Sequence, residues 1–197
     1  TMNNHKHKTK NTLVNTMPYF NRKQGSRDWG PVDVFFEESS DAQTALWAAG
    51  ELQKNHERPF FLACGIYRPH LPWHVPKEYF DKFPIEDILF PNTIANDLDD
   101  IPAKGIEMSD GLTMKGDYQR IARHEKKEEA VQAYLASINY ADQCVGLILD
   151  ALNNSRYKDN TIVILWGDHG WHFGEKLSYR KSKLWEESTR VPLMIYV

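Results

Sequence analysis

The chain has 197 residues, of which 41% are hydrophobic and 26% charged, and its 24 basic and 27 acidic residues give a formal net charge of −3. This composition excludes a disordered or collagen-like chain. No stretch reaches the roughly 18 uncharged apolar residues of a bilayer crossing, so we expect no membrane span. The near-neutral charge argues against nucleic acid as a partner, because phosphate binding requires a concentrated basic surface.

Residues 1–27 are polar and show no hydrophobic period, so we interpret them as a polar N-terminal segment. The first residue is Thr1, and no signal peptide precedes the structured part. We therefore expect either a processed chain or a piece of a longer protein.

Local sequence signals predict alternating strands and helices from residue 28 onward. A short extended segment is predicted within Pro31–Phe36. Ser40 and Asp41 are typical of a helix N-terminus, and apolar residues at helical spacing continue to about Asn55. The continuous apolar run Phe60–Ile66 is typical of a buried strand. Pro76–Phe83 predicts a short helix that begins with proline.

The second half of the chain contains the longest predicted helix and two more strands. Residues 84–117 are interrupted by prolines and glycines and are predicted to be irregular, with a solvated acidic turn at residues 97–100. An apolar stripe predicts a helix from about Asp117 to Leu152. Thr161–Trp166 is predicted to be a second buried strand, and Pro192–Val197 a third strand. This order indicates an α/β fold, a mostly parallel sheet with flanking helices.

Two loops with chemically active side chains directly follow predicted strands. Ligands of α/β proteins gather at the carboxyl ends of strands, so we expect the two loops to meet at one site. The later loop carries Asp168 and His169 between two glycines. A carboxylate beside an imidazole can provide adjacent metal ligands. The alternative is an aspartate that caps the turn and a histidine that only packs.

The earlier loop carries His70 between Pro69 and Pro72. Restricted backbone freedom suits a histidine that acts as general acid on a leaving group, although a packed loop histidine has the same pattern. Arg68 could hold a carboxylate or sulfate with its planar guanidinium, or could be a surface residue. Residues 180–183 contain three basic side chains. They form a solvated surface or, if a metal site lies beside them, one of the lysines turns toward an anionic oxygen.

Several of these blocks together resemble the type I sulfatases of the alkaline phosphatase superfamily, in particular their iduronate-2-sulfatase-like branch. The matching blocks occur in collinear order at Pro59–Ala63, Arg68–Pro72, Tyr134–Ser137, Gly167–Lys176, Leu184–Glu187 and Thr189–Pro192. The resemblance covers about residues 28–197. It identifies them as part of a sulfatase catalytic domain with an alkaline-phosphatase-like fold.

The resemblance implies hydrolysis of a sulfate ester at a formylglycine, assisted by one bound calcium ion. It implies that Asp168 and His169 are metal ligands and that Lys181 binds a sulfate oxygen. His70 would contact the sulfate and protonate the departing alcohol.

The resemblance also implies a sulfated sugar or polysaccharide as substrate and a secreted or periplasmic location. Arg68 would hold an acidic sugar, although the related branch places a lysine there. Trp171 and His172 would line the substrate pocket.

The sequence departs from the family pattern at the nucleophile. It contains no Cys-x-Pro-x-Arg or Ser-x-Pro-x-Arg segment and lacks the family's early pair of metal-binding aspartates. We therefore expect residues 28–197 to lack the N-terminal nucleophile segment and the C-terminal region of the domain, and the chain alone to be inactive. Two alternatives are a phosphoester or phosphonate hydrolase of the same superfamily, usually with two zinc ions, and a sulfatase-derived module that binds without catalysis.

Overall fold

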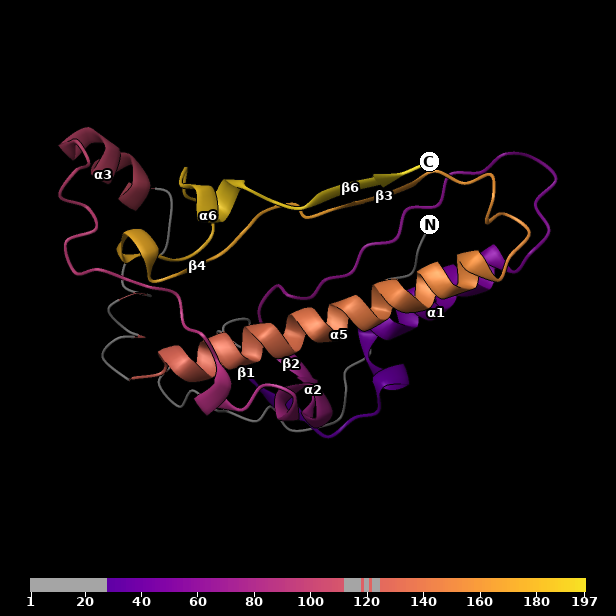
Figure 1. Cartoon of the computed structure of the whole chain (residues 1–197), viewed down its shortest axis with the longest axis horizontal. Coiled ribbons are helices and arrows are strands. Elements are labelled where there is room, and N and C mark those ends of the chain that lie inside the picture. Colours follow the sequence, from indigo (N-terminus) through magenta and orange to yellow (C-terminus); the bar gives the residue numbers. More distant parts are fainter. Residues whose placement is uncertain (1–27, 112–117, 119–120, 122–124) are drawn as a thin grey trace. The chain divides into compact units, whose positions relative to one another are not determined.

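The computed structural model describes residues 28–111, 118, 121 and 125–197 (Figure 1). The predicted polar segment 1–27 therefore lies outside the described residues. The chain divides into two compact units: Thr1–Ile88 with Gln132–Asn160 form the first unit, and Leu89–Val131 with Thr161–Val197 form the second.

The first unit combines two long helices with a pair of short parallel strands. Its elements are β1 (Trp29–Val32), η2 (Phe36–Glu38), α1 (Ser40–Leu52), β2 (Trp73–Pro76), α2 (Lys77–Asp81), η3 (Ile85–Asp87) and most of α5 (Lys127–Asn153). The predicted helices at Ser40 and after Pro76 are confirmed. The predicted long helix is confirmed from Lys127 onward, and most of its earlier part lies outside the described residues.

Helices α1 and α5 lie side by side and run in the same direction. The backbone N–H of Ala42 donates to the Tyr140 hydroxyl, and the side-chain amide of Gln53 donates to the carbonyl of Ala151. Both pairs are 98 residues apart in sequence, so one register holds along this whole length. The fully buried side chains of the two helices include several alanines, which allow close approach: Ala42, Ala45, Ala48, Ala133 and Ala136.

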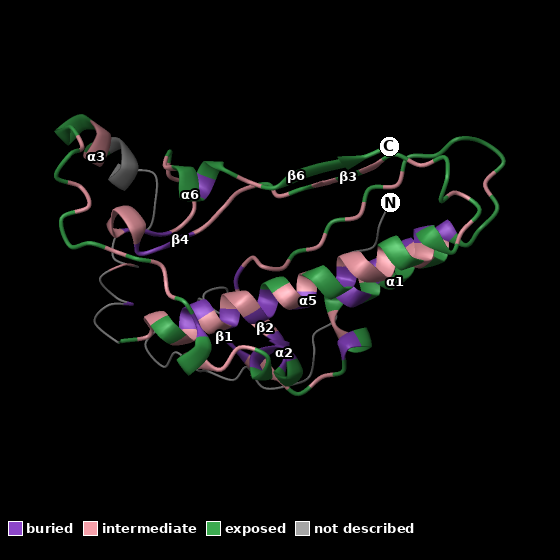
Figure 2. Ribbon diagram, in the orientation of Figure 1, coloured by how far each residue is buried: buried purple, intermediate pink, exposed green. Residues whose placement is uncertain are grey.

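Strands β1 and β2 pair in parallel, with Trp29 opposite Trp73 and Val32 opposite Pro76. The two tryptophan rings lie 5.7 Å apart and are almost fully buried, so they belong to the core of this unit (Figure 2). Because β2 begins directly after residues 67–72, this pairing fixes one end of the loop that carries His70.

The prediction of a buried strand over Phe60–Ile66 is wrong. These residues pair with no strand within the described part of the chain, and the side chain of Phe61 is 91% exposed. An apolar run satisfies its backbone as a strand only where a neighbouring strand lies alongside. The run cannot specify that neighbour.

The second unit contains short elements and two antiparallel strand pairs. It contains the first turn of α5 and, before it, α3 (Ala103–Gly111). The elements that follow α5 are β3 (Val163–Trp166), β4 (His172–Phe173), η4 (Glu175–Leu177), β5 (Tyr179–Arg180), α6 (Glu186–Thr189) and β6 (Leu193–Tyr196). Strand β3 pairs with β6, and β4 pairs with β5. The predicted strands near 161–166 and 192–197 are confirmed, but β6 is exposed along its length (Figure 2). The expected burial of β3 is wrong, because Ile164 and Trp166 are more than half exposed. Helix α3 was not expected in the stretch predicted to be irregular.

The chain is of the α/β class, with helices that accompany short strands. Of the three strand pairs in the described residues, β1–β2 is parallel and the other two are antiparallel. Within the same residues, no helix is both long and apolar enough to cross a membrane.

The Tyr140 hydroxyl is expected to be important for the stability of the first unit. It accepts the Ala42 N–H at 3.1 Å and is hydrogen-bonded to the Ser39 hydroxyl. Tyr140→Phe leaves a buried N–H unpaired and should lower the free energy of unfolding by about 1–3 kcal/mol, measured by urea denaturation of the full-length protein. Tyr196→Phe, on exposed β6, is the control and should change it by less than about 0.5 kcal/mol. Equal effects of the two variants would contradict this role.

Candidate functional site

The loop that carries His70 is held by hydrogen bonds within the first unit. The His70 Nδ1 lies 2.7 Å from the Leu71 carbonyl, and the His70 N–H donates to the Tyr67 carbonyl. Because a carbonyl only accepts, the Nδ1 carries a proton, and the Nε2 is the nitrogen whose protonation changes when the ring acts as acid or base. The indole N–H of Trp73 donates to the Pro69 carbonyl at 2.7 Å. The loop is therefore preorganised, as predicted from its prolines.

Arg68 lies along this loop and is half-buried. Its Nη2 donates to the His74 carbonyl at 3.2 Å, and its guanidinium lies 5.4 Å from the centre of the Tyr67 ring. Its Nε is buried and has no hydrogen-bond partner among the described residues. These contacts fix the position of the Arg68 side chain, so it is not a freely moving surface arginine.

In the second unit, Asp168 and His169 lie side by side directly after β3. The Asp168 Oδ2 is 3.8 Å from the His169 Nε2, and the Asp168 side chain is 86% exposed. The His169 Nδ1 lies 2.8 Å from the Gly170 carbonyl, so this nitrogen carries a proton and the Nε2 is the one available as a ligand or acceptor.

Lys181 points toward the same nitrogen. Its Nζ donates to the His169 Nε2 over 2.6 Å. The residues on either side, Arg180 and Ser182, have φ of 76° and 67°, in the left-handed region that residues other than glycine seldom adopt. Such backbone persists only where the surrounding structure determines it, and it is concentrated at functional sites. The structure therefore brings Asp168, His169 and Lys181 together, and the roles assigned to them stay predictions.

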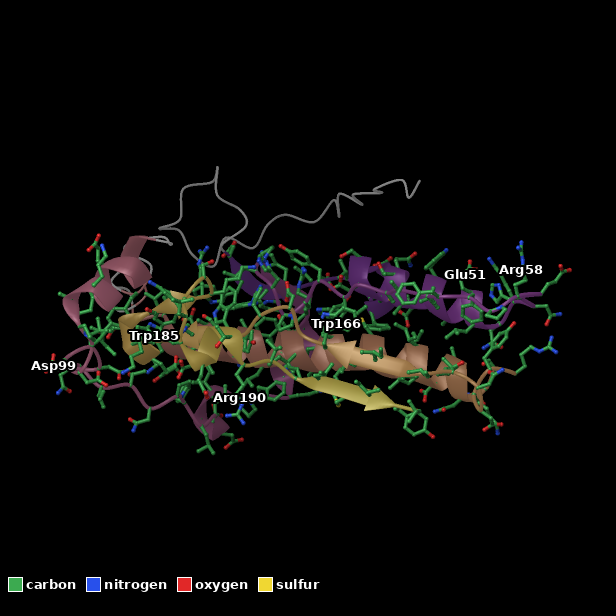
Figure 3. All side chains as sticks on the ribbon, turned by 90° about the horizontal axis from the view of Figure 1, so that it is seen from above. Glu51, Arg58, Asp99, Trp166, Trp185 and Arg190 are labelled. Atoms are coloured by element: carbon green, nitrogen blue, oxygen red, sulfur yellow. The ribbon has the colours of Figure 1, made fainter. Side chains whose placement is uncertain are left out.

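A clamp between Asp97 and Lys176 holds the turn that precedes Lys181. The Asp97 carboxylate accepts the Lys176 N–H at 2.7 Å and lies 3.1 Å from its Nζ. These hydrogen bonds from Lys176 lower the pKa of Asp97. The prediction of a solvated acidic turn is therefore wrong for Asp97, which is largely covered, but it is right for Asp99, which is exposed (Figure 3).

Trp171 and His172 follow the Asp168–His169 pair. The Trp171 ring lies 6.3 Å from the ring of His169. The His172 side chain has no exposed surface, its Nδ1 lies 3.2 Å from the Glu175 carbonyl, and burial lowers its pKa. Trp171 thus lies next to the pair, whereas His172 is buried in the interior of the unit.

The Asp168 and His169 pair fits part of a metal site. Calcium takes ligands at about 2.3–2.6 Å, so two donor atoms 3.8 Å apart can both reach one ion. Within the described residues, no third histidine, cysteine or acidic side chain joins them to form a group that could hold a metal. The pair therefore offers two ligand atoms, one from Asp168 and one from His169. In this structure the His169 Nε2 is hydrogen-bonded to the Lys181 ammonium.

The candidate residues are divided between the two units. Arg68 and His70 belong to the first unit, and the group around His169 belongs to the second. The expectation that the two loops meet at one site stays a prediction. Sequence reasoning missed Asp97 and Lys176 as partners, because no local pattern links side chains 79 residues apart.

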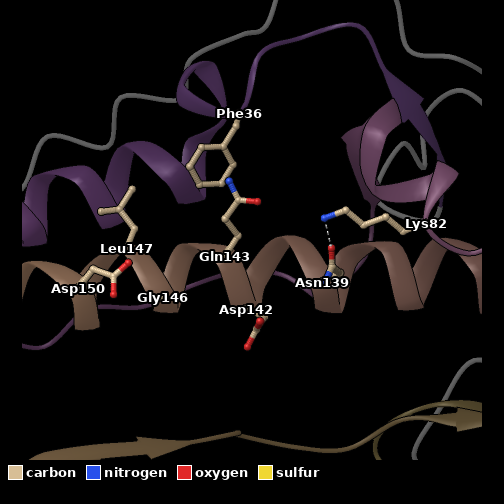
Figure 4. Close-up of a pocket in the computed structure, with 8 residues that line it drawn as sticks. All are labelled: Phe36, Lys82, Asn139, Asp142, Gln143, Gly146, Leu147 and Asp150. Atoms are coloured by element: carbon tan, nitrogen blue, oxygen red, sulfur yellow. Dashed lines mark hydrogen bonds between the residues drawn. The ribbon is translucent and has the colours of Figure 1, made fainter.

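A separate groove in the first unit has a volume of about 560 Å³ and is lined mainly by α5 (Figure 4). Its lining residues are Phe36, Lys82, Asn139, Asp142, Gln143, Gly146, Leu147 and Asp150. Lys82 donates to Asn139, and Gln143 accepts the Tyr79 hydroxyl, so several of its polar groups bind one another or the core. Neither His70 nor Arg68 lines it, and the groove is not part of the candidate site.

Gly170 is required because another backbone segment lies against it. A Cβ at this position would be 2.0 Å from the Glu187 carbonyl oxygen, and the Gly170 N–H donates to the Ser188 carbonyl. Gly170→Ala must separate the two segments and should lower the free energy of unfolding by roughly 1–3 kcal/mol in urea denaturation. Gly146→Ala, within α5 and with no atom near its added Cβ, is the control and should raise it by about 0.5–1 kcal/mol. Destabilisation of the same size in both variants would refute the close contact.

The buried histidines predict loss of stability in acid. Burial holds the pKa values of His172 and His74 below the ordinary 6.5. The unfolded chain therefore binds protons that the folded chain does not, so stability is complete above pH 6.5 and falls as pH drops toward the folded-state values. The melting temperature should fall between about pH 7 and pH 5. His172→Phe, or His172→Gln if the first variant does not fold, should lessen that fall; an unchanged slope would contradict the effect of His172.

Comparisons with known proteins show the family to which the chain is similar. The sequence model of the sulfatase family matches residues 2–197. The chain is 42% identical over 166 residues to a sulfatase of Formosa agariphila, and the aligned region covers 84% of this chain and 32% of the relative. It is 34% identical over 163 residues to the mouse iduronate 2-sulfatase, and the aligned region covers 75% of this chain and 28% of that protein.

A solved structure shows the same fold. A proposed sulfatase of Bacteroides fragilis superposes with a TM-score of 0.56 at 30% identity, over 79% of this chain and 30% of the other. The chain thus spans about a third or less of the length of the proteins it matches. The family match runs over almost the whole sequence and the fold agrees with it, so the chain belongs to the sulfatase family.

Proposed function

We propose that the protein containing this chain hydrolyses sulfate esters of saccharides. The observation that carries the proposal is the convergence of Asp168, His169 and Lys181, with the Lys181 Nζ 2.6 Å from the His169 Nε2. A carboxylate, an imidazole and an ammonium at one point suit an anionic oxygen that is bound together with a metal ion. The family supports sulfate as the anion.

Asp168 and His169 would hold a calcium ion, which would neutralise negative charge on the sulfate. The Lys181 ammonium would then leave the His169 Nε2, because the one lone pair of that nitrogen cannot bind the ammonium and a metal ion together. Lys181 would bind a sulfate oxygen with its ammonium group and stabilise charge that develops on it. The left-handed residues on both sides of Lys181 keep its direction fixed and so reduce the cost of orienting it during the reaction.

His70 would act as the general acid. As the ester S–O bond breaks, the alcohol oxygen would take the proton from the Nε2, while the Nδ1–H stays hydrogen-bonded to the Leu71 carbonyl. Arg68 would hold an acidic group of the sugar. Trp171 would line the sugar pocket, and the fully buried His172 would support that wall from inside the unit.

A formylglycine, which residues 1–197 do not supply, would provide the nucleophile. We propose that residues 28–197 form part of the catalytic domain and that the chain alone does not turn over substrate. Similarity to an iduronate 2-sulfatase supports a sulfated sugar or polysaccharide as the substrate. We also propose a secreted or periplasmic location, which the resemblance to the sulfatase family implies.

The test is an assay of the full-length protein with 4-nitrophenyl sulfate and a panel of sulfated sugars. We expect sulfate release, and His70→Ala and Lys181→Ala should each lower kcat/KM on a sulfated sugar by roughly 10²–10³-fold, the loss typical of a proton donor or a charge-stabilising group. Lys77→Ala is the control, because Lys77 is an exposed residue of α2 that pairs with Asp81.

Three outcomes would reject the proposal. Preferred cleavage of a phosphonate monoester would indicate a related hydrolase, and binding of sulfated sugar without cleavage would indicate a binding module. Parent rates in both alanine variants would show that the assigned residues do not act in the reaction.

A further inference from the structure

The carboxylate of Asp41 is buried and bound to the loop that carries His70. Asp41 is 4% exposed and lies in the first turn of α1. Its Oδ1 accepts the N–H of Tyr67 at 3.1 Å, and its Oδ2 accepts the N–H of Arg68 at 3.0 Å. A charged acceptor with two backbone donors is among the stronger hydrogen-bonding arrangements, and the positive end of the α1 dipole further favours the charge.

Tyr67 connects this carboxylate to His70 by two routes. Its carbonyl accepts the N–H of His70 at 3.0 Å. Its hydroxyl donates to the Leu71 carbonyl at 2.8 Å, which is the same carbonyl that lies 2.7 Å from the His70 Nδ1. The Tyr67 and His70 rings also lie 4.9 Å apart. Any shift of Tyr67 therefore moves both the backbone and the ring partner of His70.

The anchor itself is firmly placed. Asp41 is followed by Ala42, whose N–H is bound by the Tyr140 hydroxyl of α5. The position of the carboxylate is thus fixed by the register between the two long helices. By contrast, the run before the loop, Phe60–Ile66, has no strand partner within the described residues.

We propose that Asp41 is a positioning residue that holds His70 in the orientation needed to protonate the departing alcohol. The proposal rests on the proposed function for the role of His70. It predicts a specific loss of proton transfer rather than a general loss of structure, because the Asp41 carboxylate accepts the backbone N–H groups of Tyr67 and Arg68 and does not bind the His70 ring itself.

Asp41→Asn is the informative change, because it keeps the shape of the side chain but replaces one acceptor oxygen with an amide that donates. Either Tyr67 or Arg68 then loses its acceptor. A misplacement of about 1 Å in a catalytic group can cost about 10²-fold in rate. We expect a loss of that size on the sulfated sugar that the full-length parent hydrolyses best, whose alkoxide must be protonated to leave.

The same variant should hydrolyse 4-nitrophenyl sulfate at close to the parent rate, because a nitrophenolate leaves without a proton. His70→Ala should likewise lose more activity on the sulfated sugar than on 4-nitrophenyl sulfate. Asp41→Asn added to His70→Ala should cause little further loss, since both changes remove the same step. Asp81→Asn, an exposed aspartate of the same unit, is the matched control and should behave as the parent with both substrates.

Hydrogen exchange provides a readout that does not depend on activity. The N–H groups of Tyr67 and Arg68 are bound to Asp41, so a peptide spanning residues 66–76 should exchange faster in Asp41→Asn than in the parent or in Asp81→Asn.

Equal losses on both substrates, losses that add to those of His70→Ala, or unchanged exchange in residues 66–76 would each overturn the positioning role. Absence of sulfate ester hydrolysis by the parent protein would instead reject the proposed function, and the exchange measurement would still decide whether Asp41 holds the loop.

Discussion

The first unit depends on how the amino end of α1 is satisfied. The initial N–H groups of a helix have no partner within it and must be bound from outside. Here the Tyr140 hydroxyl of α5 binds the Ala42 N–H, which places α1 on α5 in one register. The neighbouring Asp41 is thereby fixed in the interior, where it binds the backbone of the His70 loop. One helix end thus sets both the packing of the unit and the placement of a candidate catalytic side chain.

The second unit positions its candidate residues by a different device. Its short elements provide little packing, so close backbone contacts and left-handed backbone conformations fix the candidate residues instead. Gly170 lies directly against the Glu187 carbonyl, and left-handed residues on both sides of Lys181 direct its ammonium to His169. Gly174, with φ of 121°, and the Asp97–Lys176 clamp fix the turn before it. The cost of this backbone is consistent with a segment kept for function rather than for stability.

Prediction from sequence succeeded where a signal is local. Helix α1 follows from apolar residues at helical spacing and α2 from the proline at its start, although neither has a side-chain cap. Strands β3 and β6 follow from apolar runs. It failed for Phe60–Ile66, because a strand needs a partner that the run itself does not name. It missed α3 because its residues carry no clear apolar stripe. Asp41 was recognised only as part of a helix start, since its loop partners lie 26 and 27 residues away.

The sequence by itself determined the family, the order of the main helices and strands, and the residue types able to bind a metal and an anion. These follow from spacing along the chain, which short-range sterics and hydrophobic periodicity control. Only the tertiary structure decided that Lys181 meets His169, that His172 is buried rather than exposed, and that Asp41 and Asp97 are bound to distant loops. Those contacts depend on how segments distant in the sequence pack against one another, and that is a property of the folded chain rather than of any local segment.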